Sequence, residues 1–188
     1  MSAVRIHGHD SLLGRALSDR LERADIEQSH ASVGASAGIA DTTIVCWDGA
    51  GTLPDSCDLL IRPTSVESPP CTARCELVLH DLYIPGGSGP WGPQEIEMAL
   101  DRHQRGGSGD SLEEHPRWWL HVRDLLDAVV PLLPEPPLGV LHASGRRGWP
   151  HDVLLSELDM LWSRLHAVRG SSLSAADLAP AETRLEAV

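Results

Sequence analysis

The chain has 188 residues, enough for a single domain with its own core and a short tail. Its net charge of −12 at pH 7 excludes broad binding to nucleic acid or to an anionic membrane surface. No apolar run reaches membrane-spanning length and no signal-peptide pattern occurs, so we expect a cytoplasmic protein.

Two features of the composition limit the available chemistry. All 15 basic residues are arginine, which excludes any mechanism that needs a lysine amine. The 4 cysteines contain no C-x-x-C pair, and in the cytoplasm we expect free thiols. Only Cys71 and Cys75 are close in sequence, and spacing alone favours a structural role for them over a metal or redox role.

The first twenty residues predict a strand, a tight turn and a helix. A β-branched run, Val4 to His7, precedes a segment whose leucines recur at helical spacing: Leu12, Leu13, Leu17 and Leu21. Such a unit opens dinucleotide-binding α/β folds, although a glycine pattern of this kind also occurs in strand–helix turns that bind nothing. Gly8 permits the turn, and Gly14 lets the helix approach the strand.

A serine, Ser11, stands in this turn where the dinucleotide-binding pattern has its middle glycine. A serine hydroxyl can donate to a phosphate, but its Cβ occupies the space into which a cofactor pyrophosphate would fit. We therefore expect a weakened phosphate loop, in which Gly8, Ser11, Leu12 and Gly14 are the residues that would contact a cofactor.

The rest of the chain continues the alternation of strands and helices. A weak second strand is expected within Asp25 to Val33, where Glu27 is better interpreted as a solvated side chain than as a ribose ligand. Further strands are expected at Thr42–Trp47, Leu59–Ile61, Glu76–His80 and Leu138–His142. Loops are expected at Gly34–Gly38, Pro63–Pro70, Gly86–Pro93 and Arg105–Asp110.

Three more helices are predicted from the apolar periodicity. They are Gln94–Arg105, His121–Leu133, in which Pro131 should end or bend the helix, and one that starts at Pro150. In the last helix we expect one buried face, made of Val153, Leu154, Leu158, Leu161 and Leu165. The domain prediction is residues 1–169 for an α/β domain with a parallel sheet flanked by helices, and residues 170–188 for a flexible tail.

Five segments, in chain order, resemble the extended short-chain dehydrogenase/reductase family, the NAD-dependent sugar epimerases and dehydratases. Gly8–Gly14 is similar to the family's G-x-x-G-x-x-G loop, and Thr42–Trp47 to the strand beneath the cofactor. Asp81–Gly86 is similar to N-x-Y-G-P-G, with Asp81 for asparagine and Ile84 for glycine. Arg117–Asp124 is similar to R-D-F-V-H-V-D-D, and Leu138–Gly145 to G-x-Y-N-V-G-S-G, with His142 for asparagine. The resemblance implies a Rossmann-like sheet.

The departure from this family concerns its catalytic residues. The family uses a tyrosine, a lysine four residues later and a serine or threonine, carried between the strands that correspond to Leu59–Ile61 and Glu76–His80. Here that interval is only Arg62 to Cys75, which is too short for the family's catalytic helix, and it holds no tyrosine. The single Tyr83 corresponds to a structural tyrosine of the family. The predicted fold is therefore a minimal Rossmann-like sheet without the catalytic helix.

Polar side chains at the carboxyl ends of the strands are the remaining candidates for catalysis, because open α/β sheets bind ligands at this edge. The candidate catalytic residues are His9, Asp10, Asp48, His80 and Asp81. A purely structural interpretation remains open, in which His7 is a partly buried strand residue and Asp10 and Asp48 cap helices or turns. His121 and Asp124 are better interpreted as structural. We expect no metal site.

The resemblance also suggests substrate contacts, at Tyr83, Trp91 and Arg117. In the family the matching arginine meets the phosphates of a sugar nucleotide, which suits a guanidinium. Trp91 would lie over the substrate cleft, whereas Trp118 and Trp119 are expected to anchor their segment, with at least one in the core. Arg146 and Arg147 are interpreted as exposed charges.

Two classes of function follow. The first is a non-catalytic binding or scaffolding partner in small-molecule biosynthesis, and the second is a non-redox isomerase, cyclase or lyase that uses the histidine and carboxylate groups. In either class no cofactor is required, NAD(P) would bind weakly, and a small molecule or a sugar nucleotide would be the ligand. Loss of the helix should leave Leu59–Ile61 and Leu77–Leu79 bare, so we expect a homodimer or a complex with a full-length relative.

Overall fold

The computed structural model describes residues 3–30, 42–87, 89–91, 96, 98 and 116–172. The chain divides into two compact units, Met1–Ile96 with Pro116–Trp149 and Glu97–His115 with Pro150–Val188. The first unit holds the sheet and the candidate site.

Six strands of the described residues form one sheet in the order β2-β1-β3-β4-β5-β8, and each neighbouring pair is parallel. They are β1 (Val4–His7), β2 (Gln28–His30), β3 (Thr42–Cys46), β4 (Ser56–Pro63), β5 (Thr72–Leu79) and β8 (Gly139–Ala143). Because β2 and β3 flank β1 on opposite sides, the strand order reverses at β1. The carboxyl end of β1 is therefore the place where such sheets bind ligands. The predicted Rossmann-like α/β class is confirmed.

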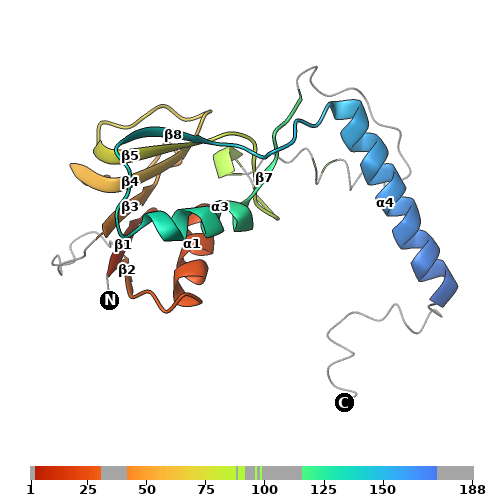
Figure 1. The fold of residues 1–188 in the computed structure, drawn as a ribbon, viewed down its shortest axis with the longest axis horizontal. Coiled ribbons are helices and arrows are strands. Elements are labelled where there is room, and N and C mark those ends of the chain that lie inside the picture. Colours follow the sequence, from red (N-terminus) through yellow and green to blue (C-terminus); the bar gives the residue numbers. More distant parts are fainter. Residues whose placement is uncertain are drawn as a thin grey trace, which may run out of the picture. The chain divides into compact units, whose positions relative to one another are not determined.

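Two helices of the first unit, α1 (Leu12–Glu22) and α3 (Val122–Val129), lie on the same side of the sheet (Figure 1). Their leucines and valines enter one large core cluster with the strands, and Leu13, Leu17, Leu21 and Val129 are fully buried. After α3 the chain continues as a 3₁₀ turn, η2 (Val130–Leu132). Pro131 therefore ends the α-helix as predicted, because proline cannot supply the next backbone donor.

The opposite side of the sheet is covered by two links that contain no helix, residues 47–55 between β3 and β4 and residues 64–71 between β4 and β5. Val45 and Leu60 are buried there beneath Trp47 and Leu53. The expectation that Leu59–Ile61 and Leu77–Leu79 lie bare is wrong, since each of these side chains is at most 5% exposed.

Strands β4 and β5 are longer than the predicted Leu59–Ile61 and Glu76–His80. They pair over their whole length, from Ser56 opposite Thr72 to Pro63 opposite Leu79. Polar residues such as Asp58 and Arg74 interrupt the apolar pattern near the start of each strand. For this reason the apolar pattern did not predict the first residues of β4 and β5. The other predicted strands agree with β1, β3 and β8.

Three short elements complete the first unit. Strands β6 (Leu82–Tyr83) and β7 (Leu120–His121) form a separate parallel pair, and η1 (Gly89–Trp91) is a single 3₁₀ turn. The predicted loop Pro63–Pro70 carries no helix, as expected. The predicted loops Gly34–Gly38 and Arg105–Asp110, and nearly all of the helix Gln94–Arg105, lie outside the described residues.

The second unit contains α4 (His151–Ser172), which starts just after Pro150 as predicted. Its predicted buried face is wrong. Leu161 and Leu165 are exposed and Val153, Leu154 and Leu158 are half-buried, because apolar residues lie on more sides of this helix than one face can bury. α4 passes the predicted start of the tail, and the rest of the tail lies outside the described residues. No helix in the described ranges is long and apolar enough to span a membrane.

Candidate functional site

The turn after β1 requires both of its glycines. Gly8 has φ +74°, and a Cβ there would overlap the carbonyl oxygen of Cys46 on the neighbouring strand. A Cβ at Gly14 would overlap the carbonyl oxygen of Gly8. The two glycines therefore have the predicted roles, a tight turn and a close approach of helix to strand.

Ser11 is the N-cap of α1. Its Oγ accepts from the amide of Gly14 at 3.0 Å and donates to the carbonyl oxygen of Gly8 at 2.7 Å. The hydroxyl is thus engaged within the turn, and one of the first-turn amides is already satisfied. The amides of Leu12 and Leu13 are the remaining first-turn donors, of the kind that bind anions at a helix N-terminus.

A pocket of about 320 Å³ opens beside this turn, at the carboxyl ends of β1 and β3. Its polar lining includes His7, His9, Asp10 and Asp48, and its apolar wall includes Trp47 and Leu53. The structure therefore brings three of the candidate catalytic residues, His9, Asp10 and Asp48, to one pocket, beside Gly8 and Ser11 of the predicted cofactor contacts. Its volume lies at the low end for small-molecule sites, about 300–1,000 Å³, and suits a single ring better than a dinucleotide.

The acid–base groups of the pocket are already partnered. His9 Nε2 lies 3.1 Å from Asp10 Oδ1, and the Asp10 side chain is 93% exposed. Asp48 Oδ1 accepts from the amide of Ala50 at 3.2 Å, so its turn-capping role is confirmed. Asp10 does not cap the helix, since Ser11 does. The His9–Asp10 pair is therefore the candidate for general acid–base catalysis in this pocket.

Two further groups in the pocket wall are neutral at pH 7. Burial, helped by the nearby charge of Arg5, lowers the pKa of His7 below its ordinary value of 6.5. Burial and the Asp48 carboxylate raise the pKa of the Cys46 thiol to about 12, so this thiol is no nucleophile. The lining residues include no arginine. The carboxylates of Asp10 and Asp48 therefore dominate its electrostatics and disfavour a pyrophosphate.

His80 and Asp81 lie at the end of β5 and are not among the pocket's lining residues. His80 Nε2 is 2.8 Å from His142 Nδ1 on β8, so one ring donates to the other. Asp81 accepts from Arg117 Nη1 at 2.9 Å and from the amide of Trp118 at 2.8 Å. The five candidate catalytic residues thus form two separate groups.

The candidate substrate residues hold the structure together around β6 and β7. Arg117 is bound to Asp81, and its backbone pairs with Trp149. Tyr83 meets Trp119 edge-on, with ring centroids 6.5 Å apart. Trp91 is only 3% exposed and belongs to the main core, so the expectation that it lies over a cleft is wrong. Gly89–Trp91, three residues of its predicted loop, form η1 instead.

Other structural interpretations are confirmed. His121 is the N-cap of α3, with Nδ1 accepting from the Arg123 amide, and Asp124 is an acid of its first turn. Glu27 is exposed and directly precedes β2, at the amino edge of the sheet, where a cofactor ribose would not reach it.

Tryptophans 118 and 119 both lie outside the core, contrary to the expectation for at least one of them. Trp118 is 44% exposed and Trp119 is half-buried. The backbone carbonyl oxygens of both tryptophans lie close to Gly145, and the Gly145 amide donates to the Trp118 carbonyl oxygen at 2.8 Å. Both residues therefore anchor the turn after β8.

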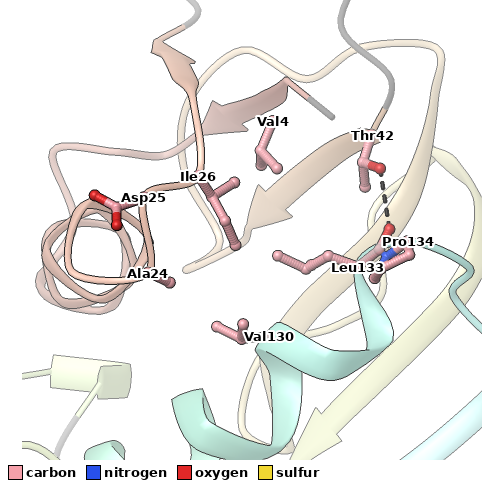
Figure 2. Close-up of a pocket in the computed structure, with 8 residues that line it drawn as sticks. All are labelled: Val4, Ala24, Asp25, Ile26, Thr42, Val130, Leu133 and Pro134. Carbon is pink, nitrogen blue, oxygen red and sulfur yellow. Dashed lines mark hydrogen bonds between the residues drawn. The ribbon is translucent and has the colours of Figure 1, made fainter. Parts of the chain in front are cut away.

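A second cavity, of about 300 Å³, lies at the amino ends of β1 and β3 (Figure 2). Ile26 and Leu133 both belong to its wall, and the dashed line in Figure 2 marks the hydrogen bond in which the Thr42 hydroxyl donates to the Leu133 carbonyl at 3.0 Å. Its lining is mostly apolar: Val4, Ala24, Ile26, Val130, Leu133 and Pro134, with Asp25 and Thr42. This cavity lies at the edge of the sheet opposite to the glycine turn.

Sequence reasoning missed the apolar wall of the carboxyl-edge pocket. Trp47 directly follows β3, so its position at the carboxyl end of a strand was the signal that could have placed it in the pocket wall. Leu53 gave none, because it lies in an irregular link. Within the described residues, no three histidine, cysteine or acidic side chains gather as metal ligands.

A scan of protein-family models gives no match for this chain, and a search of curated proteins gives none either. Solved structures do resemble it. The human epimerase family protein SDR39U1 with NADPH has a TM-score of 0.56 and 11% identity, over 80% of this chain and 77% of that one. The Bordetella bronchiseptica enzyme WbmG with NAD has a TM-score of 0.59 and 13% identity, over 85% and 78%.

The dTDP-glucose 4,6-dehydratase of Bacillus anthracis with NAD has a TM-score of 0.52 and 11% identity, over 87% of this chain and 81% of that one. These neighbours are extended short-chain dehydrogenase/reductase proteins of the NAD-dependent epimerase and dehydratase type. The predicted resemblance is therefore confirmed at the level of the fold, which is what identities this low establish.

Proposed function

We propose that this protein binds a small polar ligand in its carboxyl-edge pocket and acts as a binding or scaffolding partner in small-molecule biosynthesis, without hydride transfer. The observation that carries this proposal is the link of residues 64–71, which joins β4 to β5 without a helix. That interval is where the resembling family carries its catalytic tyrosine and lysine, and the chain has no lysine at all.

The chemistry of the pocket supports an uncharged, hydroxyl-bearing ring, such as a sugar, as the ligand. Of a sugar nucleotide only the sugar would enter the pocket, with the pyrophosphate outside it. The carboxylates of Asp10 and Asp48 accept hydrogen bonds from hydroxyl groups, and the Trp47 ring provides an apolar surface in the same wall. The same carboxylates oppose a pyrophosphate, so NAD(P) would bind weakly and is not required.

Calorimetric titration of the purified protein with a free hexose, a sugar nucleotide, NAD and NADP tests this proposal. Binding of the sugar or sugar nucleotide that weakens at least tenfold in Asp48→Asn, and less in the control Asp159→Asn, which is not among the pocket's lining residues, supports it. Tight dinucleotide binding, or no binding by any of the four, contradicts it.

The exposed apolar residues of β8 support a role in assembly. Among the described strands, β8 pairs with β5 alone, and none of them pairs with its outer edge. Within β8, Val140 is 57% exposed and Leu141 36%, and Leu138, which comes directly before Gly139, is 81% exposed. An apolar edge strand of this kind pairs readily with another strand. We propose that two copies of the chain associate through β8 rather than through the covered faces of β4 and β5.

The His9–Asp10 pair at the pocket mouth favours one alternative, a non-redox isomerase, cyclase or lyase. In that case His9 takes a proton from the bound ligand and Asp10 stabilises the imidazolium that forms. Turnover of a pocket ligand by the wild type but not by His9→Gln, with ligand affinity unchanged, would establish this alternative.

A further inference from the structure

Two thiols that are far apart in sequence meet at the start of the β4–β5 pair. Cys57 Sγ on β4 lies 3.6 Å from Cys71 Sγ, which directly precedes β5. The parallel register produces this contact, because Ser56 lies opposite Thr72 and Cys57 lies opposite Ala73. The sequence singled out Cys71 and Cys75 instead, and the structure gives Cys71 a different neighbour.

The two sulfurs differ in access to solvent. Cys57 is buried, at 7% exposure, whereas Cys71 is half-buried and can be reached by a small oxidant. Burial and, as the second cause, the hydrogen bond from Cys71 raise the pKa of the Cys57 thiol, so Cys71 is the thiol that reacts first. Reaction of Cys71 removes the second of these causes. Cys46 and Cys75 are both buried in the main core cluster.

The backbone around the pair is already fixed on both sides. The amide of Thr72 donates to the carbonyl oxygen of Asp55 at 3.0 Å, and the amide of Cys71 donates to the carbonyl oxygen of Pro69 at 2.8 Å. A disulfide needs the sulfurs to approach from 3.6 Å to about 2.05 Å, which side-chain rotation can supply.

From this geometry we propose that Cys57 and Cys71 form a reversible dithiol/disulfide couple, a modification site that ties the link of residues 64–71 to β4. With glutathione disulfide as the oxidant, the Cys71 thiolate attacks one sulfur and releases one glutathione thiolate. Cys57 then gives its proton to the released glutathione thiolate and attacks the Cys71 sulfur of the mixed disulfide, which releases the second glutathione as a thiolate. Two protein thiols are oxidised and one glutathione disulfide is reduced.

The location of the couple connects it to the candidate site. Cys57 and Cys71 belong to the small apolar cluster that also contains Trp47 and Leu53, two residues of the pocket wall. The link that Cys71 ends also carries the carbonyl of Glu67, which accepts from Trp47 Nε1 at 3.2 Å. The disulfide therefore closes within the structure that supports this wall.

The test oxidises the reduced full chain with glutathione disulfide, alkylates the remaining thiols and identifies linked peptides by mass spectrometry. We expect wild type to fall from 4 free thiols to two, with Cys57 joined to Cys71, and dithiothreitol to restore all 4. Cys57→Ala should stop at one glutathione on Cys71. The control Cys75→Ala should still form the Cys57–Cys71 bond, whereas Cys71→Ala should form none.

Retention of all 4 thiols by the folded wild type would overturn the proposal, and so would a disulfide that joins Cys71 to Cys75. Failure of Cys57→Ala to take up glutathione would overturn the order of the two steps. Circular dichroism of each variant before oxidation establishes that the compared proteins are folded.

Discussion

Arg117 Nη1 donates to Asp81 Oδ1 over 2.9 Å, and this ion pair ties the segment before β7 to the end of β5. The Asp81 side chain is only 16% exposed and also accepts from the Trp118 amide. Asp81 adopts φ 48°, a left-handed conformation that the surrounding contacts must hold. The arginine that the resemblance assigned to a substrate phosphate therefore has an internal carboxylate as its partner.

Replacement of this arginine should lower stability and leave ligand affinity intact. Arg117→Ala leaves a mostly buried carboxylate without its cation, which should cost about 1–3 kcal/mol of unfolding free energy in urea. The control Arg146→Ala removes an exposed charge and should change the unfolding free energy by less than about 0.5 kcal/mol. If Arg117→Ala instead keeps wild-type stability and loses sugar-nucleotide binding, the arginine is a substrate residue.

No oxidation or reduction with NAD(H) or NADP(H) should occur, because the chain has no lysine to lower the pKa of a catalytic tyrosine. Absorbance of reduced nicotinamide, followed over a panel of sugar nucleotides and ketones, measures this. Turnover that scales with protein concentration would show that other residues have replaced the tyrosine–lysine pair.

Dinucleotide binding should be no tighter than roughly 100 μM, about −5.5 kcal/mol. The physical reasons are the Ser11 Cβ, the Gly14 amide occupied by Ser11 Oγ, and the carboxylates of Asp10 and Asp48. Ser11→Gly removes the first two and should tighten binding, measured by calorimetry.

Ser11→Ala is the matched control for that variant. It also frees the Gly14 amide but keeps the Cβ, and it should cost about 1 kcal/mol of stability through the lost cap. Tightening in Ser11→Gly alone would identify the Cβ as the obstacle, and tightening in both would identify the occupied amide. A sub-micromolar constant for the wild type would contradict the prediction.

Stability should fall as the pH is lowered through the range just below the ordinary histidine value. The pKa of His7 in the folded protein lies below 6.5, so between these two values the unfolded chain binds more protons. The unfolding free energy therefore decreases as the pH falls through 6.5, until His7 is also protonated in the folded protein. His7→Gln should flatten this part of the profile, measured by urea unfolding at several pH values, and an unchanged slope would contradict the assignment.

Association through β8 should be sensitive to one exposed side chain. Val140→Glu places a charge on a residue that is 57% exposed, so it should leave the fold intact and shift the dimer to monomer in light scattering. The control Val168→Glu alters a residue of α4 that is 64% exposed. A monomeric wild type, or loss of the dimer in the control alone, would contradict association through β8.

The sequence by itself determined the elements whose causes are local. The leucine spacing and the two glycines define β1, its turn and α1, because a Cβ at Gly8 or Gly14 would collide with backbone atoms. Pro131 ends α3 for an equally local reason. The sequence also predicted that a ligand site lies at the carboxyl ends of the strands, because open α/β sheets bind ligands there.

Tertiary structure alone decided which side chains meet across long intervals of the chain. The register of β4 and β5 pairs Cys57 with Cys71, and the folding of the β6–β7 region joins Arg117 to Asp81 and buries Trp91. Register and coverage depend on packing between distant segments, so no local periodicity encodes them. For the same reason the sequence predicted a bare sheet face, whereas Trp47 and Leu53 from an irregular link cover it.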